Sequence, residues 1–144
     1  MNPPLLEKLL LDLESLNDDY LKADTLIELS DQFEQVPEDL APTPFPSSNK
    51  VPACESEVYV FFKKNQDLTI KYYFAVLNPQ GISAKAFAVI LDQTLSNQPL
   101  AQVSQVDDDI IKRIFGAGIS MGKGMGLRSM LGVVKAIATN NIGG

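Results

Sequence analysis

Five prolines close together constrain the fold of this chain more than any other feature of its sequence. Each proline removes a backbone hydrogen-bond donor and disfavours helix at the residue before it. The stretch from Val36 to Pro52 is therefore expected to be a connector that lies over the surface; its prolines are Pro37, Pro42, Pro44, Pro46 and Pro52. Because this connector is too short and too embedded to separate two domains, we expect one domain over residues 1–144, a length that supports a single hydrophobic core.

Helical patterns precede the connector. Pro3 and Pro4 stand ahead of leucines whose spacing of three and four residues predicts an amphipathic helix with one apolar stripe: Leu5, Leu6, Leu9, Leu10, Leu13 and Leu16. A second helix is predicted to start after Asp18 and Asp19 and to end near Gln35, with a buried side drawn from Leu26, Ile27, Leu29 or Phe33. These two segments predict a helical layer.

A β-hairpin is predicted after the connector. Residues 57–64 and 67–77 are rich in β-branched and aromatic side chains, and the sequence Asn-Gln-Asp where they meet supplies a turn. Alternation along the first strand puts two sets of side chains on opposite faces, with Val58, Val60 and Phe62 on one face and Tyr59, Phe61 and Lys63 on the other.

The last part of the chain returns to helical patterns. A turn at residues 78–81 precedes a helix predicted over residues 82–95, with buried positions at Ala84, Phe87, Ala88 and Leu91. Residues 100–106 predict a short edge strand, and the acidic run 107–109 caps a helix that ends at Gly116. The final helix has an apolar stripe made of Leu127, Met130, Leu131, Val134, Ile137 and Ala138. This order predicts an α+β fold, in which a small antiparallel sheet packs against the N- and C-terminal helices.

Charge and hydropathy disfavour two classes of partner. The formal net charge is -6 and no window concentrates Lys and Arg, so we expect no nucleic-acid partner. The leucine-rich N-terminus is interrupted by Glu7, Lys8 and Asp12 and predicts neither a signal peptide nor a membrane span. With one cysteine and no targeting signal, the chain is expected to be a cytoplasmic protein with a free thiol.

The amino-acid composition disfavours most kinds of catalytic site. The chain has one cysteine and no histidine, so a cysteine-protease-type nucleophile lacks its base and a zinc or iron–sulfur site lacks ligands. The glycine-rich segment Gly116–Gly126 is not a phosphate-binding loop, because five residues separate Gly116 from Gly122 and a glycine follows Lys123. We interpret this segment as a flexible connector between helices, and we expect the chain to bind no cofactor and no metal.

The single cysteine, Cys54, lies where the connector meets the hairpin. A free thiol can exchange with another thiol, or accept sulfur from a persulfide, without a proton relay if it is accessible and partly ionised. Glu55 and Glu57 disfavour the thiolate by their charge, whereas Lys50 favours it. The alternative is a small, inert, buried side chain. A position just after Pro52, in a connector, favours a presented thiol.

The stretch from Asn49 to Tyr59, NKVPACESEVY, resembles the signature of the SufE family, a V-x-G-C-x-S-x-V-W pattern that carries a sulfur-accepting cysteine; the matching residues are Val51, Cys54, Ser56 and Val58. Weaker landmarks occur in the expected order within residues 20–138, namely Ile27-Glu28-Leu29 and Gly126-Leu127 with Met130. The sequence departs from the family pattern at Ala53, where Gly is usual, at Tyr59 for Trp and at Lys123 for Arg. The segment 78–87 also lacks the Asp-containing turn of the family.

The resemblance implies a sulfur carrier. In that family the cysteine takes persulfide sulfur from a cysteine desulfurase, stimulates that enzyme, and passes sulfur to the iron–sulfur cluster assembly scaffold; the pyridoxal phosphate belongs to the desulfurase. Transferred to this chain, Cys54 is the nucleophile, Ser56 orients the loop through its hydroxyl, and Lys123 supplies positive charge toward the persulfide or the partner. The family also implies a cysteine loop that shelters the persulfide and swings out, and Ala53 is expected to stiffen it.

A non-catalytic regulator is the alternative hypothesis. Such a protein keeps the fold and docks on a desulfurase or on a cluster-assembly scaffold without carrying sulfur on Cys54. An iron–sulfur scaffold of related shape is disfavoured, because a single cysteine cannot by itself ligate a cluster.

Overall fold

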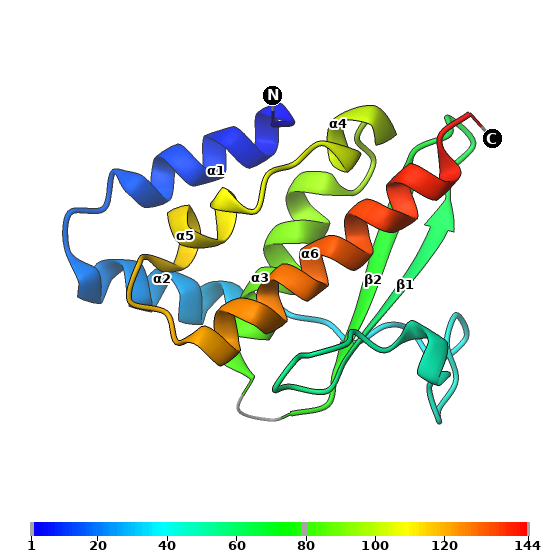
Figure 1. Cartoon of the computed structure of the whole chain (residues 1–144), viewed down its shortest axis with the longest axis horizontal. Coiled ribbons are helices and arrows are strands. Elements are labelled where there is room, and N and C mark those ends of the chain that lie inside the picture. Colours follow the sequence, from blue (N-terminus) through cyan, green and yellow to red (C-terminus); the bar gives the residue numbers. More distant parts are fainter. Residues whose placement is uncertain (1, 79–80, 144) are drawn as a thin grey trace.

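The computed structural model describes residues 2–78 and 81–143. These residues form six α-helices, one short 3-10 helix and a two-stranded antiparallel sheet, which confirms the predicted α+β class. In chain order the elements are α1 (Pro4–Glu14), α2 (Asp19–Asp31), η1 (Ser47–Asn49), β1 (Val58–Lys64), β2 (Ile70–Val76), α3 (Ile82–Leu95), α4 (Leu100–Ser104), α5 (Asp109–Phe115) and α6 (Met121–Asn141). The hairpin lies on one side of α3 and α6, and α1, α2 and α5 lie toward the other side (Figure 1).

The leucine stripe fixes α1 against its neighbours. Pro4 occupies the first turn of the helix, where a missing N–H is tolerated. The helix contacts α3 and α5, and the buried leucines are Leu6, Leu10 and Leu13. From α5, Arg113 binds the carboxylates of Glu7 and Glu14 at 2.9 and 2.8 Å. Hydrogen bonding to this guanidinium holds the pKa of both carboxyl groups below the usual range and ties α1 to α5.

The hairpin buries side chains on both of its faces. β1 pairs with β2 in the predicted antiparallel sense, from Val58 opposite Val76 to Lys64 opposite Ile70. Alternate side chains of β1 enter the main core, and the others join a second cluster on the outer face, which includes Tyr59, Phe61 and Ala75. The proline-rich connector covers that outer face with Val36, Leu40, Ala41 and Phe45. The connector therefore lies at the surface and also completes the core of the sheet.

The edge strand predicted over residues 100–106 is wrong. Leu100–Ser104 forms the short helix α4, which packs against α6. The amide of Val103 donates to the carbonyl of Pro99 at 3.1 Å, so a helical turn begins directly after the proline. Leu100 and Val103, three residues apart, are both buried. Burial of two side chains three residues apart fits a helical turn and not strand alternation.

The second helix is shorter than predicted. α2 ends at Asp31 and does not reach Gln35, because the chain turns there to meet the edge of β2, where the amide of Val36 donates to the carbonyl of Phe74 at 2.9 Å. Ile27, one of the candidates for the buried side of this helix, is 44% exposed. The other candidates are partly buried against the main core: Leu26, Leu29 and Phe33.

The final helix begins before its apolar stripe does. α6 starts at Met121, and the hydroxyl of its N-cap, Ser120, accepts the amide of Lys123 at 3.2 Å. Gly122 to Gly126, predicted to be part of a flexible connector, are therefore helical, and only residues 116–120 join α5 to α6. Ser120 is a residue type favoured at the N-cap, and its cap fixes the start of the helix ahead of these glycines.

The helix predicted over residues 82–95 is α3, with the same bounds. Its four predicted core positions are all buried: Ala84, Phe87, Ala88 and Leu91. The turn predicted at residues 78–81 includes residues 79–80, which lie outside the described part of the chain. No helix in the described residues is long and apolar enough to cross a membrane.

Candidate functional site

A short loop presents Cys54 at one end of the hairpin. The amide of Val51 donates to the carbonyl of Val58 at 2.8 Å, so the chain before the loop pairs with the start of β1. Residues 52–57 form the loop between these two points, and we call them the cysteine loop. The loop lies beside the first turns of α6 (Figure 1). The fixed ends leave Cys54 near the tip of a short, anchored segment.

Cys54 opens onto a cavity of ≈ 330 Å³. The cysteine loop, the start of α3 and the first turns of α6 line this cavity. The three residues singled out from the sequence all lie on its wall, Cys54 and Ser56 from the loop and Lys123 from α6. Cys54 is half-buried and Lys123 is exposed. The fold thus brings these residues to one place, and their roles in chemistry stay predictions.

Two glycines of α6 allow the cysteine loop to approach the helix closely. A Cβ atom at Gly126 would lie 3.0 Å from Cys54 Sγ and 3.2 Å from Cys54 Cα. A Cβ atom at Gly122 would overlap the carboxylate of Glu55. Any larger residue at either position would displace the loop or a side chain of it. The glycines are therefore the surface on which the loop is seated.

The surroundings of Cys54 favour the protonated thiol. Burial raises the pKa of the thiol above its ordinary value, the backbone N–H of Ser56 acts in the opposite direction by donating to the sulfur, and the charge of Glu55 raises the pKa further. The hydroxyl of Ser56 packs toward Gly81, where a Cβ atom would lie 3.0 Å from Oγ. With the loop in this position, the sulfur is sheltered and little ionised at neutral pH.

Alkylation of Cys54 by iodoacetamide is expected to have a pH midpoint above that of an unfolded thiol, because burial raises the thiol pKa. The linked stabilisation of the fold is fully present below the unfolded-state pKa and is lost as pH rises through the higher folded-state pKa. Alkylation rates followed by intact mass, in buffer and in concentrated urea, give the two midpoints. A native midpoint at or below the urea midpoint would contradict this prediction.

An Ala53→Gly variant is expected to be more stable than the parent by about 1 kcal/mol. Ala53 has a φ of 56°, in the left-handed region that disfavours residues with a Cβ atom. Urea denaturation measures the change. The control is Ala117→Gly, at an exposed residue in the segment between α5 and α6, which adds the same flexibility to the unfolded chain and is expected to destabilise slightly. Equal effects of the two substitutions would show that φ at residue 53 is not the cause.

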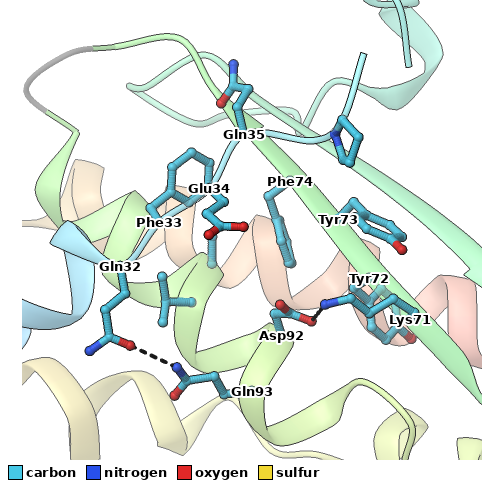
Figure 2. A pocket seen from close by; sticks show the side chains of 13 residues that line it. Gln32, Phe33, Glu34, Gln35, Lys71, Tyr72, Tyr73, Phe74, Asp92 and Gln93 are labelled. Atoms are coloured by element: carbon cyan, nitrogen blue, oxygen red, sulfur yellow. Dashed lines mark hydrogen bonds and ion pairs between the residues drawn. The ribbon is translucent and has the colours of Figure 1, made fainter. Parts of the chain in front are cut away.

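A second cavity, of ≈ 300 Å³, lies between residues 32–37, β2 and α3 (Figure 2). Polar side chains in its wall pair with one another, Lys71 with Asp92 and Gln93 with Gln32. It shares no lining residue with the cavity at Cys54. Within residues 2–78 and 81–143, no cluster of three or more His, Cys, Asp or Glu side chains is arranged to hold a metal ion. The cavity that contains the thiol is therefore the candidate site.

The sequence analysis missed two parts of this site. Glu55 was weighed only for its charge beside the thiol, and Gly122 was assigned to a flexible connector. The available signal was the spacing of Gly122 and Gly126, which are four residues apart directly before an apolar stripe. Residues at this spacing share one face of a helix.

The comparisons with known proteins agree with the fold. The sequence matches the family described as SufE, Fe-S metabolism associated domain, over residues 7–138. No curated protein matches the chain. Among solved structures, it is similar to a hypothetical protein from Thermus thermophilus, whose solution structure matches with a TM-score of 0.75 and 21% identity over 100% of both chains. That likeness supports the architecture. Because the family match covers most of the chain, this protein belongs to the SufE family of Fe-S metabolism associated domains.

Proposed function

We propose that this protein accepts sulfur from a cysteine desulfurase on Cys54, stimulates that enzyme, and delivers the sulfur to a scaffold for iron–sulfur cluster assembly. The observation that carries the proposal is a single free thiol on a cavity, in a chain whose family is associated with Fe-S metabolism. In this proposal the pyridoxal phosphate belongs to the desulfurase and this chain carries no cofactor. Its cytoplasmic location stays a prediction.

The proposed transfer moves one sulfur atom without net oxidation or reduction. Cys54 first loses its proton to solvent, and its thiolate attacks the outer sulfur of a persulfide on the desulfurase. The new S–S bond forms as the old one breaks, and the desulfurase cysteine leaves as a thiolate. No histidine is needed for this exchange, which fits a chain that contains none.

The cavity wall contains a hydrogen-bond donor to the sulfur and a cationic side chain. The backbone N–H of Ser56 donates to Cys54 and stabilises the thiolate. Lys123 brings a cationic side chain to the same cavity, where positive charge favours a thiolate or a persulfide anion. The raised thiol pKa in the seated loop implies that the sulfur ionises more readily after the loop moves away from α6.

Exposed apolar side chains beside the cavity are suited to a protein partner. Ile82 lines the cavity and is 46% exposed. Met121 and Met125, in the first turns of α6, are 81% and 45% exposed. Methionine side chains adapt to the shape of a partner surface, and exposed apolar side chains near a cavity favour association. We therefore place the desulfurase contact at this end of the molecule.

Incubation with a cysteine desulfurase and free cysteine tests the proposal. The intact mass of the protein is expected to rise by one sulfur atom, peptide mapping is expected to place that atom on Cys54, and a thiol reductant is expected to remove it. If desulfurase turnover rises while no sulfur reaches Cys54, the sulfur-carrier proposal is wrong and the protein is a docking regulator.

A further inference from the structure

Glu55 makes a contact with α6 that the proposed transfer chemistry does not use. Its side chain is exposed, yet the carboxylate lies so close to Gly122 that a Cβ atom there would overlap Oε1. Gly122 belongs to the first turn of α6, and that turn contains no acidic residue of its own. The unpaired amides of a helix N-terminus carry partial positive charge, which favours a carboxylate at this position.

We propose that Glu55 is the latch of the cysteine loop: its carboxylate, seated over Gly122 at the start of α6, holds Cys54 against Gly126 and so controls how often the thiol becomes accessible. Glu55 is thus a positioning residue, because it acts on sulfur transfer through Cys54. The inference rests on the proposed function for its biological meaning, but its test requires only this protein.

Two contacts on the same face of α6 carry the argument. Glu55 meets Gly122, and Cys54, its neighbour in the chain, meets Gly126 about one turn further along the helix. Two adjacent loop residues, Cys54 and Glu55, therefore pack on two successive turns of α6. Loss of one contact is expected to weaken the other. Gly132, on the same helix, is different, because a Cβ atom there would meet nothing within 4 Å.

Alkylation of Cys54 in the folded protein measures the opening of the loop. Glu55→Ala removes the carboxylate, and Gly122→Ala retains it but fills its seat. Each substitution is expected to raise the iodoacetamide rate roughly two- to fivefold, the range expected for a carboxylate lost from a helix N-terminus. Gly132→Ala, the matched control, is expected to leave the rate unchanged. Urea denaturation in parallel shows whether global stability follows the same order.

The double variant separates a latch from a general effect on the helix. If the two residues act through one contact, Gly122→Ala is expected to have no further effect on the rate in a Glu55→Ala background. Because Gly122→Ala retains the Glu55 carboxylate, faster alkylation of this variant cannot come from loss of that charge. Unchanged alkylation in Gly122→Ala, or independent effects of the two substitutions, would overturn the proposal. Neither result depends on whether a desulfurase loads Cys54.

Discussion

A Cys54→Ser variant is expected to leave a cysteine desulfurase at its unassisted rate and to carry no transferred sulfur, while still binding the enzyme. A serine hydroxyl remains protonated at neutral pH and is a poor nucleophile toward a persulfide. The side chains are close in size and Cys54 is only half-buried, so the fold is expected to persist. Sulfide release by the desulfurase and intact mass of the variant measure the two losses. Competition with the parent protein measures retained binding.

Ser56→Ala is the matched control for that experiment. It removes the hydroxyl and retains the backbone N–H that donates to Cys54, so a smaller loss of transfer is expected. Should Cys54→Ser stimulate the desulfurase as well as the parent protein does, the thiol has no role in stimulation. The docking regulator would then explain the function, since docking needs the fold and the surface near α6 but no nucleophile.

Local periodicity was sufficient to predict much of the architecture. The apolar spacing in residues 82–95 defined α3, because all four positions of that pattern are buried. The hairpin followed from two β-rich runs around a turn. Such patterns do not show that the chain after α2 meets the edge of β2. The carbonyl of Phe74 in β2 accepts the amide of Val36, and α2 ends early for this reason. Residues 100–106 are too few for alternation to be distinguished from a helical turn.

The candidate site was predictable only in part, for a related reason. A motif of neighbouring residues pointed to Cys54 and Ser56, and a weaker landmark pointed to the region of Lys123; the structure places all three on one cavity wall. The seat of the cysteine loop depends instead on contacts between residues far apart in the sequence. The spacing of Gly122 and Gly126 places them on one helix face, but it does not show which segment packs against that face. A glycine indicates a close approach of two segments only when the segment packed against it is known.

A Gly126→Ala variant is expected to release the cysteine loop more strongly than loss of the Glu55 contact does. The new Cβ atom would lie 3.2 Å from the Cα atom of Cys54 as well as 3.0 Å from its sulfur. A flexible carboxylate can move aside at Gly122, but at Gly126 the backbone of the loop itself has to shift. Relative to Gly132→Ala, which meets nothing within 4 Å, Gly126→Ala is expected to be less stable by about 1–3 kcal/mol.

The same substitution tests whether the seat shelters a transferred sulfur. If opening becomes easier by about 1.4 kcal/mol, the open population rises roughly tenfold, and dithiothreitol is expected to remove sulfur from loaded Cys54 faster by a similar factor. Gly132→Ala, loaded in the same way, is expected to lose its sulfur at the parental rate. Alanine has a higher helix propensity than glycine, so each substitution also stabilises α6 to a similar extent. Comparison of the two variants removes this shared contribution. Equal rates of sulfur loss would mean that the contact of Cys54 with Gly126 does not protect the persulfide, whatever its effect on stability.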